Sequence, residues 1–114
     1  MIRKANEIEH KDATLFGGPG ELHSNILLKA DEFFNKGRLF NHCTLHPGEA
    51  IGVHPHNNEF EVYYILSGKG LYNDNGTEKV ITTGDLTICY SGEKHGLKND
   101  SDEDLTFIAL IIFS

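Results

Sequence analysis

The chain has 114 residues, of which 39% are hydrophobic and 24% are charged, and its formal net charge at pH 7 is −7. This length fits one domain, and the hydrophobic content excludes a disordered chain. The acidic charge argues against a nucleic-acid partner, because binding to phosphates requires a basic face.

Turn residues divide the chain into short runs rich in Val, Ile, Tyr, Phe and Thr, with turns about ten residues apart, which is typical of an all-β sandwich or barrel. We expect an N-terminal arm over about 1–36, with a flexible turn at Gly17 to Gly20 and a short helical turn around Asp31–Asn35. Asn73 to Gly76 should form a hairpin turn, since Asn and Gly tolerate positive φ. The predicted strands are 24–29, 37–46, 50–55, 59–67, 70–73, 78–82, 86–90, 93–98 and 104–113.

Two predicted strands, 59–67 and 104–113, carry apolar residues on both faces. A strand with one face in water should alternate apolar and polar residues, so both faces of these strands must be covered. We expect the N-terminal arm to cover one face and the second subunit of a homodimer to cover the other.

The sequence contains no evident membrane or secretion signal. The N-terminus, MIRKANEIEH, lacks the apolar centre of a signal peptide, and the longest apolar run, 107–113, is too short to span a bilayer as a helix. We therefore expect a cytoplasmic protein that has no membrane partner. Cys43 and Cys89 lie in predicted strands outside any CxxC motif, where we expect small buried side chains.

Histidines and carboxylates gather at the entrance to the predicted strand 59–67. His54 and His56 share one face of the preceding strand, because successive side chains point to opposite faces. Glu61 can point into the same cavity, and His95 lies in a later strand-and-turn segment. Three imidazoles and one carboxylate suit Mn, Fe, Ni or Zn, whereas calcium needs more oxygen ligands. The alternative is a set of ordinary surface side chains, which is how we interpret His10, His23 and His46.

The spacing of these residues resembles the two sequence motifs that define the cupin superfamily. In the first, over 48–68, Gly48 is followed by EAIGV, HPH, NNEF, E, VYYILS and a second glycine. In the second, over 84–99, the glycine is followed by DLTIC, YSG, EK, H, GLK and N. Tyr90 stands where the family has proline, which affects the local bend of the chain and no ligand.

The resemblance implies a single-domain cupin β-barrel over 1–114, of the double-stranded β-helix or jelly-roll type. It also implies one divalent transition metal per chain, with His54, His56, Glu61 and His95 as ligands. Four protein ligands leave open coordination positions for water, substrate or oxygen, and such an ion can act as a Lewis acid.

Members of this superfamily carry out many reactions, so the fold does not select one. We expect a metal-dependent enzyme that acts on a small polar metabolite, a sugar or an organic acid, by isomerase or lyase chemistry. The alternatives are an iron-dependent dioxygenase and a non-catalytic module that binds a small molecule. Oxalate chemistry ranks low, because the resembling oxalate decarboxylases carry an arginine where this chain has Ile51.

Three residues are candidates for catalysis beside the ion. Tyr63 shares a face with Glu61 and could either donate a hydrogen bond to the substrate or fill space. His42 is a candidate acid or base if its face of the strand looks inward, although the opposite face, with Leu39 and Cys43, is more apolar. Glu59 could transfer protons, but we favour a rim position exposed to water for it.

Overall fold

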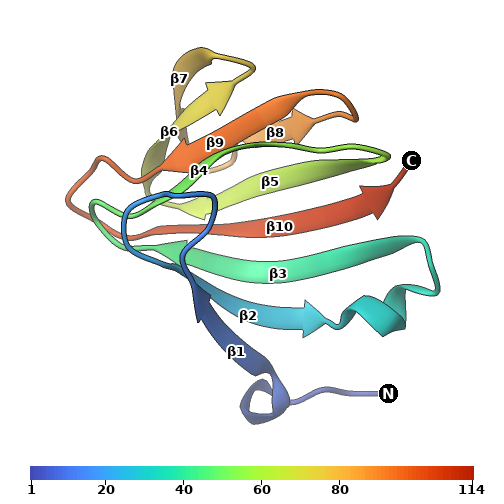
Figure 1. Ribbon diagram of the computed structural model, residues 1–114. Coiled ribbons are helices and arrows are strands. Elements are labelled where there is room, and N and C mark those ends of the chain that lie inside the picture. The colour runs from blue at the N-terminus through green and yellow to red at the C-terminus, as the bar shows by residue number, and fades with distance from the viewer.

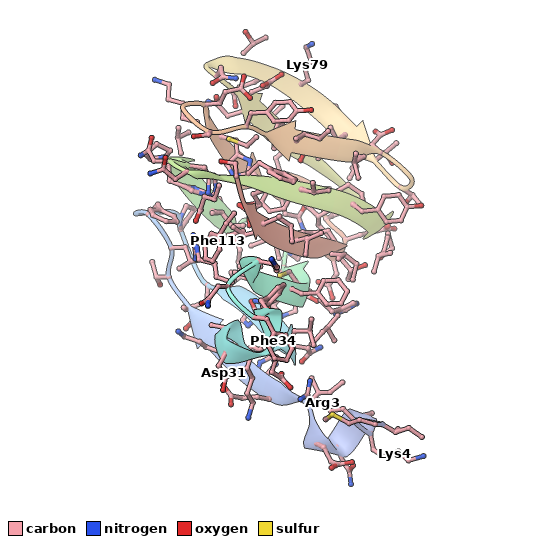
Figure 2. The ribbon with its side chains drawn as sticks, turned by 90° about the vertical axis from the view of Figure 1, so that its right-hand side faces the viewer. Arg3, Lys4, Asp31, Phe34, Lys79 and Phe113 are labelled. Carbon is pink, nitrogen blue, oxygen red and sulfur yellow. The ribbon has the colours of Figure 1, made fainter.

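Ten strands form two antiparallel sheets that face each other in the computed structural model, which describes residues 1–114 (Figure 1). The larger sheet has the order β1-β2-β3-β10-β5-β8 and consists of β1 (Glu9–Ala13), β2 (Leu22–Leu28), β3 (Gly37–Leu45), β10 (Leu105–Phe113), β5 (Glu59–Ser67) and β8 (Leu86–Cys89). The smaller sheet has the order β4-β9-β6-β7 and consists of β4 (Ala50–Pro55), β9 (Lys94–Lys98), β6 (Lys69–Asp74) and β7 (Thr77–Thr82). Figure 2 shows Lys79, on β7, at the opposite end of the molecule from Arg3 and Lys4.

The prediction of an all-β fold is confirmed, and each predicted strand is present with ends within about two residues of the prediction. The sequence did not predict β1, because its residues, EHKDA, lack an apolar face and four of the five are exposed at the edge of the sheet. Two short 3₁₀ helices complete the structure, η1 (Ala5–Glu7) and η2 (Ala30–Phe33). The second begins one residue before the predicted helical turn, and neither helix is long enough to cross a membrane.

The expected hairpin turn joins β6 to β7. Asn75 and Gly76 both have positive φ, 53° and 98°, and the Gly76 amide donates a hydrogen bond to Oδ1 of Asn73 at 2.7 Å. The turn at Tyr90 is closed without the family's proline. The backbone amide of Tyr90 donates a hydrogen bond to the Glu93 carboxylate at 2.8 Å, a bond that a proline could not make.

The predicted flexible turn at Gly17 to Gly20 is wrong, because the loop between β1 and β2 is docked along β4 (Figure 1). The amide of Ala50 donates to the Pro19 carbonyl at 3.0 Å, and the amide of Gly52 donates to the Leu15 carbonyl at 3.1 Å. A Cβ at Gly18 would lie 2.1 Å from the Ala50 carbonyl oxygen, so only glycine allows this approach. The segment expected as an arm therefore supplies two strands and a fixed loop.

The core lies between the sheets. Cys43 and Cys89 are buried and unpaired, as expected. The members of the central cluster come from both sheets: Leu22, Cys43, Leu45, Ile51, Tyr63, Ile65, Tyr72, Ile81, Leu97, Leu105, Phe107 and Ala109.

Candidate metal centre

Four buried side chains contributed by both sheets meet in the space between them. β4 carries His54, and His56 follows its last residue, Pro55, which points out to solvent. Glu61 lies on β5, and His95 on β9 is the direct partner of His54 in the β4–β9 pair. The four side chains are almost fully enclosed, with at most 5% of any residue exposed. The structure thus brings together the four residues that the sequence grouped.

The distances between their donor atoms suit a shared cation. Oε1 of Glu61 lies 3.0 Å from Nε2 of His56 and 3.0 Å from Nε2 of His95, and these two nitrogens are 3.1 Å apart. Nε2 of His54 is farther from Glu61, at 3.8 Å. Two ligands at a right angle, each about 2.1 Å from one ion, are about 3 Å apart. The donor set therefore fits a transition metal of the first row.

Each imidazole is oriented by a hydrogen bond at Nδ1, the ring nitrogen that is not directed at the centre of the cluster. Nδ1 of His54 lies 2.8 Å from the Gly52 carbonyl, which can only accept a hydrogen bond. Nδ1 of His56 lies 2.5 Å from the Glu59 carboxylate, and Nδ1 of His95 lies 2.8 Å from the hydroxyl of Tyr72. With a proton on each Nδ1, all three Nε2 lone pairs point to the centre, which is the form that binds a metal.

The three histidines stabilise the negative charge of Glu61 at the centre of the cluster. Burial opposes the charge of Glu61, but hydrogen bonds with the three histidines outweigh it, and the pKa of Glu61 is held well below its usual value. The hydrogen bond with Glu61 is also the main reason that the pKa of His56 is raised, whereas burial lowers the pKa of His95. Glu61 favours the binding of a proton to His56, and a divalent cation at the centre of the cluster would replace that proton.

Glu59 is buried, so the expectation of a water-exposed rim position is wrong. Only 9% of the residue is exposed, and its carboxylate accepts a hydrogen bond from His56 and two from Arg38, from Nε and Nη2, each at 2.8 Å. The bonds from Arg38 are the main reason that the pKa of Glu59 is lowered. Glu59 therefore remains charged and orients His56, with no free oxygen to take a proton from a substrate.

Two tyrosines flank His95. Tyr63 stacks on its ring, with ring centroids 4.9 Å apart and an angle of 14° between the planes, and it lines the cavity described below. Burial raises the pKa of Tyr63 well above its usual value, so the phenol stays protonated. The sequence did not predict the role of Tyr72, because its contact with His95 depends on the pairing of β6 with β9, which no local pattern indicates.

His42 lies outside the site. It is on the face of β3 that turns away from the cavity, half-buried, with Nδ1 3.5 Å from the Asn25 amide nitrogen. The opposite face of β3, which carries Leu39 and Cys43, looks inward, in agreement with the alternative considered above.

A cavity of about 310 Å³ opens beside three of the four donors, His54, His56 and Glu61. Most of its wall is apolar, and Lys11, Arg38, Ser24 and Asn41 add polar groups to it. Phe16, in the docked β1–β2 loop, stacks on the ring of His54 at 4.0 Å with an angle of 9° between the planes. This contact covers one side of the donor group with an apolar ring.

The surface histidines form a separate network. Nδ1 of His23 lies 2.7 Å from the Asp12 carboxylate, and its Nε2 lies 2.9 Å from Glu49. Asp12 also contacts His10, and the amide of His46 donates to Glu49. These bonds connect the edge strand β1 and its neighbour β2 with the loop before β4, a contact that treating each histidine singly did not predict.

The model of the cupin domain family matches residues 41–112. A protein of Thermotoga maritima named "Oxalate-binding protein" is 41% identical over 113 residues, covering 98% of this chain and 93% of that protein.

Solved structures show the same relationship. The structure of a protein described as a predicted oxalate decarboxylase from Thermotoga maritima is 40% identical and covers both chains completely, with a TM-score of 0.93. An RmlC-like cupin from Shewanella frigidimarina shares the fold with 20% identity and a TM-score of 0.74, over 97% of this chain and 88% of that one.

Proposed function

Because the chain belongs to the cupin domain family, we propose that it binds one divalent transition metal per chain and uses the ion to hold a small organic acid. The observation that carries this proposal is the set of four buried donor atoms, His54, His56, Glu61 and His95, next to a cavity. Mn, Fe, Ni and Zn all accept such ligands. The bound ion would act as a Lewis acid toward the ligand's oxygens. The proposal places this activity in the cytoplasm.

An organic acid is favoured over a sugar by the lining of the cavity and by the related protein. The wall is mostly apolar and offers few groups that could bond several hydroxyls, whereas a carboxylate can bind directly to the ion. The name of the Thermotoga relative makes oxalate one candidate for this chain. Ile51 lines the cavity and supplies no arginine for a carboxylate, so the metal itself would have to hold oxalate.

Binding is better supported than proton-transfer catalysis. Both oxygens of Glu59 are bonded, His42 lies outside the cavity, and Tyr63 is a buried phenol with a raised pKa. Apart from the four donors, the cavity thus presents no group suited to act as a base near neutral pH. The proposed activity is therefore metal-dependent binding, with the iron-dependent dioxygenase as the alternative to be tested.

The test is metal analysis of protein purified without chelators, followed by calorimetric titration with oxalate. We expect about one equivalent of metal per chain and binding of oxalate only to the metal-loaded form. The His54→Ala, His56→Ala double variant should lose both, while His42→Ala, a histidine outside the site, should keep both. Full retention of metal by the double variant would overturn the ligand set. Oxygen consumption by the iron-loaded protein would favour the dioxygenase.

We further propose that a second copy of the chain covers the outer face of the larger sheet. Residues of β5 and β10 on this face are apolar, and on β8 both Leu86 (54% exposed) and Ile88 (37% exposed) are accessible. Val62 is aligned with Ile88 on one side and with Leu110 on the other, so the apolar surface is continuous across three strands. Such a surface is typical of a two-fold symmetric interface.

Light scattering coupled to size exclusion tests this interface. The protein should elute with the mass of a dimer, and Ile88→Lys should shift it to a monomer at micromolar concentration. Val80→Lys, at an exposed apolar position on the other sheet, is the matched control and should leave the dimer intact. A monomeric native protein would contradict the proposal.

A further inference from the structure

The cavity is larger than the head group of an organic acid requires. Its volume of about 310 Å³ is at the lower end of the range of cavities that hold drug-sized ligands, about 300–1,000 Å³. Oxalate has only six heavy atoms and would occupy the space next to the donors. The remaining volume extends along the inner face of the larger sheet and is lined by Leu22, Ile26, Leu39, Phe107, Ala109 and Ile111.

This part of the cavity does not suit a second carboxylate. Arg38 lines the wall, but its Nε and Nη2 are both bonded to Glu59, so its charge is already paired. Lys11 is exposed at the rim, on the edge strand β1. A carboxylate placed between the donors and the rim would lose its hydration and gain no ion pair, which is costly.

One polar residue of this wall keeps its acceptor out of reach of the cavity. Oδ1 of Asn41 is inaccessible to solvent and has no hydrogen-bond partner, although Asn41 lines the cavity and is aligned with Ala109 on the neighbouring strand. Because Oδ1 is closed off from the cavity space, it offers no polar contact to a bound ligand, and the accessible wall beside Ala109 is apolar.

We infer that the cavity selects a 2-oxo or 2-hydroxy carboxylic acid with a branched aliphatic or phenyl side chain. This inference rests on the proposed function, because the two head-group oxygens would bind the ion held by His54, His56, Glu61 and His95. The side chain lies against Leu39, Ala109 and Ile111, away from water. The chemical class is therefore an acid that is polar at one end and apolar at the other, in contrast to oxalate.

The first test compares acids that share a head group. Metal-loaded protein is titrated by calorimetry with pyruvate, 4-methyl-2-oxopentanoate, phenylpyruvate, 2-oxoglutarate and oxalate. Each additional buried carbon strengthens binding about fourfold, so 4-methyl-2-oxopentanoate, which has three more carbons than pyruvate, should bind about 60-fold more tightly. 2-Oxoglutarate should show no such gain. Equal affinities for pyruvate and 4-methyl-2-oxopentanoate, or tightest binding of 2-oxoglutarate, would overturn the inference.

The second test fills the cavity. Ala109→Leu should reduce the advantage of 4-methyl-2-oxopentanoate over pyruvate at least tenfold, because it fills the space that the ligand's side chain would occupy. Ala13→Leu, on the edge strand β1, provides the same test at a position more tolerant of a larger side chain. Ala30→Leu, at an exposed site in η2, is the matched control and should change nothing. An unchanged advantage in both cavity variants would refute the inference.

The outcomes separate the inference from the proposed function. If no acid binds the metal-loaded protein, including oxalate and pyruvate, the proposed function fails. If oxalate or pyruvate binds and the apolar acids gain nothing, only the inference about the side chain fails.

Discussion

Tyr72→Phe should weaken metal binding without touching any of the four donor side chains. The hydroxyl of Tyr72 lies 2.8 Å from Nδ1 of His95, and the exposed fractions of the two residues are 4% and 0%. Water cannot replace the lost acceptor in so enclosed a place, so the Nδ1 proton of His95 is left unpaired. An unpaired buried donor costs about 1–3 kcal/mol. With a central value of about 2 kcal/mol, the dissociation constant of the metal rises roughly 30-fold.

The assay is competition with a fluorescent zinc or manganese chelator, together with thermal unfolding in excess chelator. The unfolding measurement separates loss of metal affinity from general destabilisation. Tyr90→Phe removes the same hydroxyl from an exposed tyrosine and should leave the metal affinity unchanged. A Tyr72→Phe protein whose metal affinity stays within threefold of the native value would refute the reasoning that this phenol orients His95.

Three further experiments test the ion pairs of His23, the close approach at Gly18 and the contribution of a bound metal to stability. Interaction with Asp12 is the main reason that the pKa of His23 is raised above 6.5, and the pKa values of Asp12 and Glu49 are lowered. The stabilisation by His23 is therefore present between about pH 5 and 6.5. It is lost as the pH rises through the raised pKa of His23 or falls through the lowered pKa values of the two carboxylates. Melting curves of His23→Asn should therefore show a deficit of about 1 kcal/mol near pH 6 and a smaller one at pH 9; an equal deficit at both would contradict the ion-pair explanation. Gly18→Ala should unfold at least ~2 kcal/mol more easily in urea, because its Cβ would collide with the Ala50 carbonyl, and native stability would contradict the close approach. Removal of metal by chelation should lower the melting temperature, since 100-fold saturation stabilises the fold by about 2.7 kcal/mol; identical melting of both forms would speak against a buried metal site.

Much of the strand pattern was predictable because it is local. Turn residues bound runs of β-formers, and the alternation of side chains along a strand places His54 and His56 on one face without knowledge of the fold. β1 escaped prediction because an edge strand exposed on both faces needs no apolar periodicity.

The surroundings of the donors could not be read from the sequence, because they depend on which strands are neighbours. Arg38 reaches Glu59 only because β3 and β5 both flank β10, and Tyr72 reaches His95 only because β6 pairs with β9. The contact with Arg38 encloses Glu59, and because the sequence does not show which strands flank β10, it predicted a rim position instead.

The proposed ion site and the wall of the cavity, which the docked loop and the inner face of the larger sheet provide, come from different segments of the chain. The proposed ion-binding side chains lie between residues 54 and 95, whereas most of the cavity wall comes from residues 11–43 and 107–111. Affinity for the ion and preference for the organic ligand therefore depend largely on different segments, although Arg38 and Phe16 of the first segment contact Glu59 and His54. A chimera that takes its first 45 residues from the Thermotoga relative would keep all four proposed ion-binding residues and exchange most of the cavity wall.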